Sequence, residues 1–132
     1  MKKLIALSLL LFIIGCDNST GSESVHPLVG TWEITEITAT SGSQSVTLTA
    51  DDDNNQTFIF NAVGTYSYVT EMDGEYSSGN GTWSTTDNNI TFIEDGETSI
   101  LSYSVSGGIL TLTSSDTTDG ITTTLVQIFQ KQ

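Results

Sequence analysis

The sequence predicts an all-β domain: a small up-and-down antiparallel β-barrel of about eight or nine strands. Three observations predict it. From Val29 onward the chain is rich in Thr, Ser, Ile, Val and aromatic residues, it contains no proline, and turn residues recur every 8–12 residues or so. Short links between the strands suit a barrel of consecutive hairpins. A Greek-key sandwich, the alternative, needs longer crossovers.

The first half of the domain begins at Leu28-Val29-Gly30-Thr31-Trp32, just after the only proline, Pro27. The glycine lets the backbone turn into a strand, and the tryptophan is large enough to plug one end of a barrel. Beyond it, alternation of apolar and polar residues predicts strands at 30–40, 45–50, 56–63 and 65–72.

The second half is divided by Asp-Gly, Asn-Gly and Gly-Gly pairs, which tolerate the positive φ of tight turns. Residues 73–81 are bracketed by two such pairs, and we interpret them as a polar loop. A second loop is expected at 116–120. Strands are predicted at 82–86, 90–94, 97–106, 109–114 and 121–130.

Eight aromatic residues are candidates to line the interior of the barrel. They either surround a ligand cavity or simply form the core, since small barrels often fill with their own side chains. These residues are Trp32, Phe58, Phe60, Tyr66, Tyr68, Trp83, Phe92 and Tyr103.

The first fifteen residues have the features of a signal peptide. Two lysines precede an apolar run from Leu4 to Ile14, which is shorter than the roughly 20 residues of a membrane-spanning helix. The run ends at Ile13-Ile14-Gly15-Cys16, which resembles the lipobox of a bacterial lipoprotein signal. The resemblance implies that residues 1–15 are removed and that Cys16 carries a diacylglyceryl group and an N-acyl chain such as palmitate. Several chains together anchor a protein stably in a membrane.

We therefore expect the protein to be located in the bacterial cell envelope. Asp17 resembles the signal that retains enteric lipoproteins in the inner membrane, but other bacterial groups do not follow that rule. The outer membrane is favoured, and the inner one stays open. Residues 17–24 have no apolar side chain to bury, so we expect a lipidated cysteine and flexible tether over 16–27, followed by a barrel domain over 28–132.

Within the domain, Leu28-Val29-Gly30-Thr31-Trp32-Glu33 resembles the opening of bacterial lipocalin-like domains. Phe58-Ile59-Phe60 followed by Gly64-Thr65-Tyr66-Ser67 is similar to their second and third strands. The resemblance implies a small lipid-tethered barrel that binds apolar small molecules. True lipocalins stack an arginine of the last strand over the first-strand tryptophan. This chain has no arginine, and Lys131 lies past the expected strand end, so we expect no such stacking.

Charge and residue types argue against several other classes. Sixteen acidic residues face three basic ones, whereas nucleic-acid binding needs clustered Lys and Arg. The only cysteine is the expected lipid acceptor, and the only histidine, His26, lies at the end of the tether. A Ser-His or Cys-His nucleophile pair or a His/Cys metal site is therefore not expected in the domain.

The acidic segment 51–55 begins like a calcium loop, with Asp51, Asp53 and Asn55 alternating. Gln56 stands where the turn glycine belongs, and Ala62 where the bidentate glutamate belongs. We predict a solvated acidic loop without metal or cofactor, with a looser calcium site as the alternative.

Three functions of different classes are open at this point. The favoured one is a monomeric, membrane-tethered lipoprotein whose barrel binds a small apolar or amphipathic molecule. The alternative is an envelope module with a filled core, which recognises a protein or glycan through its surface. The third is a hydrolase with two carboxylates, but nothing in the spacing selects such a pair, so we expect no enzyme.

Overall fold

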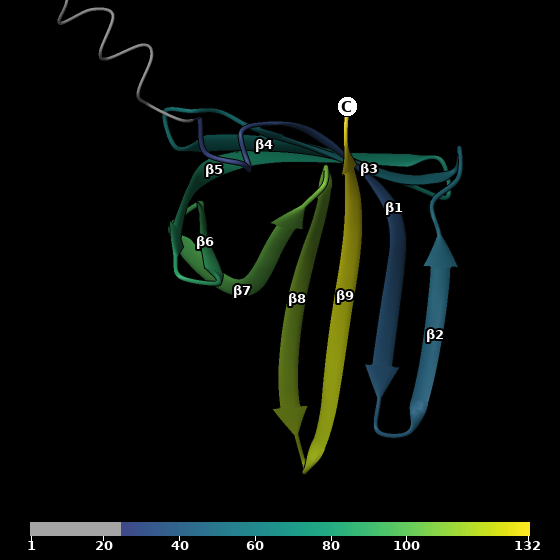
Figure 1. The fold of residues 1–132 in the computed structure, drawn as a ribbon. Helices are drawn as coiled ribbons and strands as arrows, with labels where there is room; N and C mark the ends of the chain where they lie inside the picture. Colours follow the sequence, from purple (N-terminus) through teal and green to yellow (C-terminus); the bar gives the residue numbers. More distant parts are fainter. Residues whose placement is uncertain (1–24) are drawn as a thin grey trace, which may run out of the picture.

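The computed structural model describes residues 25–132, so the expected signal, Cys16 and most of the expected tether lie outside the described residues. None of the described part forms a helix long and apolar enough to cross a membrane. Nine antiparallel strands make up one sheet (Figure 1). They are β1 (Gly30–Ser41), β2 (Gln44–Thr49), β3 (Asn54–Phe60), β4 (Thr65–Met72), β5 (Glu75–Thr86), β6 (Asn89–Glu94), β7 (Glu97–Ser106), β8 (Ile109–Thr118) and β9 (Ile121–Lys131).

Eight of these strands close into a barrel, which confirms the predicted fold class. β3 to β9 pair in chain order, and β1 pairs with both β3 and β9 to complete the ring. β2 is the additional strand. It pairs with residues 36–41 of β1, whereas β3 pairs with residues 30–33 of the same edge. The register of β1 against β9 shifts between Ile34 and Glu36, at the point where β1 changes its other partner.

Part of the sheet continues beyond the barrel. β7 pairs only with residues 109–113 of β8, so the rest of β8 extends past it together with β9, β1 and β2. Figure 1 shows the β1–β2 and β8–β9 hairpins projecting together, away from β3, β4 and β5. Cross-strand hydroxyl pairs support this extension, with Oγ distances of 2.9 Å for Thr38–Thr47 and 3.0 Å for Ser115–Thr124.

The core fills the opposite end of the barrel. Its largest fully buried side chains come from both ends of the domain and from the strands between: Trp32, Phe60, Phe129, Leu28, Ile90, Leu110 and Leu112. Phe58 stacks on Phe60 with ring centroids 5.6 Å apart and meets Phe129 edge-on at 5.5 Å. The Trp32 indole N–H donates a 2.7 Å hydrogen bond to the Leu28 carbonyl, which satisfies a buried donor.

Two predicted loops are strands in the structure. β5 begins at Glu75 rather than Thr82, and all eight residues of β4 pair with it. Gly79 and Gly81 lie opposite Tyr68 and Tyr66, so the glycines mark close packing and not a turn. β8 continues to Thr118, and only Asp119-Gly120 turns the chain, with φ of 53° and 78°. A smaller correction concerns β3, which ends at Phe60 rather than at 63.

The expectation that Lys131 lies past the end of the last strand is wrong. β9 continues to Lys131, which pairs with Trp32. The Lys131 ammonium lies 5.4 Å from the centroid of the Trp32 ring, within cation–π range. It also donates a 3.4 Å hydrogen bond to the Pro27 carbonyl. A lysine therefore covers the tryptophan in this chain, in place of the arginine.

Candidate functional site

The eight candidate aromatic residues all belong to the filled end of the barrel. Trp32, Phe58, Phe60, Tyr66 and Phe92 are buried members of the core, and Tyr68, Trp83 and Tyr103 pack against it while partly exposed. None of them lines the cavity at the other end of the barrel. Tyr66 and Phe92 also line a separate hollow of about 300 Å³, together with Glu94.

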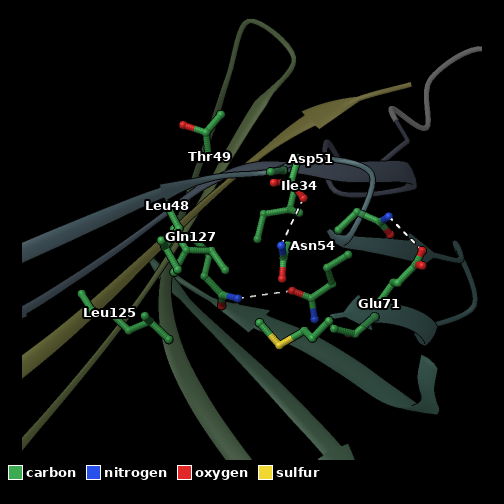
Figure 2. Close-up of a pocket in the computed structure, with 15 residues that line it drawn as sticks. Ile34, Leu48, Thr49, Asp51, Asn54, Glu71, Leu125 and Gln127 are labelled. Atoms are coloured by element: carbon green, nitrogen blue, oxygen red, sulfur yellow. Dashed lines mark hydrogen bonds between the residues drawn. The ribbon is translucent and has the colours of Figure 1, made fainter. Parts of the chain in front are cut away.

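A cavity of about 650 Å³ opens at the end where the sheet extends; we call it the mouth cavity. It lies between the β1–β2–β9 sheet and the β3–β4 hairpin. Figure 2 shows Leu48 and Leu125 on one side of it and Glu71 on the other. Most of the lining is apolar and comes from Ile34, Ile37, Ala39, Leu48, Ala50, Met72 and Leu125.

The mouth cavity follows from the change of partner along β1. Beyond the register shift, Ile37 lies opposite Leu48 of β2 and Gln127 of β9, and Ala39 lies opposite Leu125. Directly paired residues of antiparallel strands project to the same face, so these side chains form one wall. The β3–β4 hairpin supplies the other wall, where Asn54 pairs with Met72.

Polar groups form the rim of the mouth cavity. Asp51 Oδ1 accepts hydrogen bonds from the Asp53 N–H at 3.0 Å and from Asn54 Nδ2 at 3.1 Å. Glu71 Oε2 accepts one from Asn55 Nδ2 at 3.3 Å. Gln127 Nε2 donates to Gln56 Oε1 at 3.3 Å. The three side-chain to side-chain bonds are drawn as dashed lines in Figure 2. The bonds to Asp51 and Glu71 hold the two carboxylates at defined positions on the rim.

A second hollow of about 430 Å³ adjoins the first and is more polar. Five residues line both of them: Ile34, Thr49, Ala50, Asp51 and Asn55. The second hollow adds Glu33 and Asp52 to the carboxylates near Asp51. The apolar lining of the mouth cavity therefore lies next to acidic residues of the adjoining hollow, namely Glu33, Asp51 and Asp52.

A separate polar cluster lies at the side of the barrel, where β5 and β6 pair over residues 82–86 only. The hydroxyls of Tyr66 and Tyr68 donate to the two oxygens of Glu94, at 3.1 Å and 3.3 Å. Burial first, and then the hydrogen bond to Glu94, raises the pKa of Tyr66 to about 12. Burial and the charge of Glu94 also raise the pKa of Tyr68. Both tyrosines therefore stay protonated at neutral pH and bind β4 to β6.

Other candidate groups have structural partners. Within the described residues, no three His, Cys, Asp or Glu side chains are grouped so as to hold a metal ion. His26 Nδ1 accepts a 3.2 Å hydrogen bond from the Leu28 N–H, and its Nε2 lies 3.2 Å from Thr85 Oγ1. His26 therefore fixes the segment that precedes β1 against β5.

The described residues thus form a small closed β-barrel with an apolar cavity at one end. The chain belongs to the lipocalin-like domain family, whose match covers residues 28–112. The fold is similar to the crystal structure of a lipocalin-like protein from Bacteroides uniformis. That match has a TM-score of 0.56 and 16% identity, and it covers 81% of this chain and 100% of that one.

A second solved structure, of the siderocalin Ex-FABP, matches with a TM-score of 0.45 and 10% identity, covering 81% of this chain and 75% of that one. The search of curated proteins found no match. The family match over residues 28–112 confirms the predicted resemblance to lipocalin-like domains.

Proposed function

We propose that this protein is a membrane-tethered lipoprotein of the cell envelope that binds a small apolar or amphipathic molecule in the mouth cavity. The observation that carries the proposal is the apolar cavity of about 650 Å³ at one end of the barrel, which none of the aromatic core residues lines. Its volume falls in the range of roughly 300–1,000 Å³ that is usual for small-molecule sites.

Apolar surface left in solvent supports ligand binding there. The side chain of Leu48 is 60% exposed and that of Met72 is 51% exposed, although both line the cavity. A ligand that covers such surface gains about 25 cal/mol for each Å² of apolar area removed from water. Apart from β2, which pairs with β1 alone, the strands that line the cavity belong to the closed barrel, so little ordering is needed when the ligand enters.

Binding is tested with residues 16–132 carrying Cys16→Ser, a chain that retains every described contact and lacks the expected lipid acceptor. The probe is N-phenyl-1-naphthylamine, an uncharged apolar dye that fluoresces in apolar surroundings. We expect saturable binding, and a loss of at least about tenfold in affinity in Ala39→Trp, which fills the cavity from an exposed position on β1.

The matched control is Ala62→Trp, which adds the same side chain at an exposed turn position that does not line the cavity. Native mass spectrometry of the same chain, compared with its denatured mass, detects a ligand retained from the cell. Absence of dye binding would contradict the proposal and favour the alternative, an envelope module that acts through its surface.

The membrane anchor is a separate part of the proposal and rests on the lipobox ending at Cys16. Cells fed a clickable palmitate analogue should label the full-length protein and place it in the membrane fraction. Cys16→Ala should abolish both the label and the membrane association. Label that persists in this variant would contradict lipidation at Cys16.

A further inference from the structure

All the charged side chains that line the mouth cavity and the adjoining hollow are acidic. Asp51 and Glu71 lie in the lining of the cavity, Glu33 and Asp52 lie in the adjoining hollow, and none of the lining residues is basic. The described residues include one lysine, Lys131, and no arginine. The Lys131 ammonium lies over the Trp32 ring. No positive side chain in either hollow is thus available to meet an anionic group.

We propose that the ligand of the mouth cavity is a cationic amphiphile, an apolar body that carries a protonated amine or a quaternary ammonium group. This inference rests on the proposed function and specifies its ligand class. The apolar body would lie against Leu48, Leu125 and the neighbouring apolar lining. The cationic head would lie at the acidic rim, near Asp51 and Glu71.

The rim is arranged to present negative charge. The side-chain amide of Asn54 and the backbone N–H of Asp53 both bond to the same oxygen of Asp51, Oδ1. The Asn55 amide bonds to Oε2 of Glu71. These amides orient the carboxylates and bring no positive charge of their own, so each carboxylate has lone pairs to offer a cation.

The cavity wall strengthens the effect of this charge. A cleft lined by one sign of charge with apolar walls concentrates the electrostatic field and attracts counter-ions. A fatty acid or another anionic amphiphile would bring a third negative charge to the same rim. Like charges brought together in a partly desolvated site are disfavoured, so the cavity should discriminate against anions.

The test compares three probes of equal chain length: decyltrimethylammonium, decanol and decanoate, each below its micelle concentration. Each displaces N-phenyl-1-naphthylamine from the residue 16–132 chain with Cys16→Ser at low salt. We expect the cation to bind about tenfold or more tightly than the anion, with decanol between them. The ratio of cation to anion affinity should fall as salt is added, because ions screen exposed charges.

Two isosteric variants, Asp51→Asn and Glu71→Gln, locate the source of the preference. Each keeps an acceptor oxygen for its amide partner and removes one charge, so the fold should persist while the cation-to-anion ratio drops at least about threefold. Asp87→Asn is the control, since Asp87 lies in the β5–β6 turn at a φ of 52° that asparagine also adopts, and it lines neither hollow.

The outcomes separate this inference from the proposed function. Dye binding without a preference for the cation would leave the cavity as a binding site and overturn its ligand class. A preference that Asp51→Asn and Glu71→Gln leave unchanged would also overturn the inference, because it would arise from overall charge. Failure of the dye itself to bind would overturn the proposed function.

Discussion

Trp32 is held at the closed end of the barrel by two polar partners from distant parts of the chain. Its indole N–H donates to the Leu28 carbonyl at 2.7 Å, and the Lys131 ammonium lies 5.4 Å from its ring centroid. The segment before the first strand and the end of the last strand therefore both contact this one side chain. The contribution of the cation can be measured separately from that of packing.

Lys131→Met keeps most of the aliphatic stem and removes the charge over Trp32. We expect it to lower the free energy of unfolding by about 0.5–1 kcal/mol, the usual contribution of an exposed cation–π pair. Lys131→Arg should keep that stability, because a guanidinium also stacks on an aromatic face. Urea unfolding of the three proteins measures this, and equal loss in both variants would contradict a role for the charge.

The raised pKa of Tyr66 predicts that the folded protein loses stability at alkaline pH. This pKa is raised to about 12, against a value near 10 for a tyrosine in an unfolded chain. Between these values the folded state holds a proton that the unfolded state has released, so stability declines as pH rises from about 10 to 12. Below that window this contribution is fully present.

Tyr66→Phe tests this linkage, because phenylalanine keeps the buried ring and has no proton to lose. Unfolding free energies measured by urea at pH 9 and pH 11 should differ less in the variant than in the unmodified protein. Tyr103→Phe is the control, since it removes a hydroxyl from a residue at the edge of the same core. An unchanged pH dependence in Tyr66→Phe would show that other groups cause the decline.

At the scale of a strand, the glycines of β5 lie within a paired strand, where neighbouring strands pack closely, and not in a turn. A Cβ at Gly81 would collide with the Ile93 carbonyl of β6, and one at Gly79 would collide with Tyr68 and Glu94. β5 and β6 pair over only five residue pairs, from Thr82–Ile93 to Thr86–Asn89. Gly81 therefore allows a short but necessary junction of the barrel to form.

Gly81→Ala is expected to destabilise the protein by about 1–3 kcal/mol, as overpacking against a backbone atom does. Ser78→Ala on the same strand, at an exposed position, should change stability by no more than about 0.5 kcal/mol. Thermal unfolding followed by circular dichroism compares the two. Equal melting temperatures would mean that β5 and β6 tolerate separation at this point.

The strand-level predictions succeed and fail for identifiable reasons. β4, β7 and the start of β9 are found where alternation of residue types places them, and in β7 partly buried and exposed residues alternate from Leu101 to Ser106. Residues 75–81 and 116–118 lack that alternation and fall within the predicted loops. They are strands because a neighbouring strand pairs with them along its length, an interaction that local composition does not report.

At the scale of the whole molecule, the charge imbalance is the dominant feature. The full chain has a formal net charge of −13, and the described acidic residues are spread over many turns and strands. Mutual repulsion of these charges opposes the compact state, and dissolved ions screen it over about 10 Å at 0.1 M salt. Stability should therefore depend on ionic strength.

We expect the urea midpoint of unfolding to rise as sodium chloride increases from about 0.01 to 0.5 M, where screening is nearly complete. Sodium and potassium chloride should act alike if the effect is general screening. Calcium at about 1 mM should add nothing beyond its ionic strength unless the acidic loop at 51–55 binds it, the looser site left open by the sequence. A midpoint that falls with salt would contradict net repulsion.

The sequence by itself determined that this protein is an antiparallel barrel of the lipocalin-like family. It also placed the aromatic core residues, from Trp32 to Tyr103, because side chains alternate between the two faces of a strand. Tertiary structure alone decided which end of the barrel is filled, where β1 changes partner, and that Lys131 covers Trp32. The physical reason is that side-chain periodicity reports which face of a strand is buried. Strand length, register and closure depend on pairings between residues far apart in the chain, and the mouth cavity is a product of those pairings.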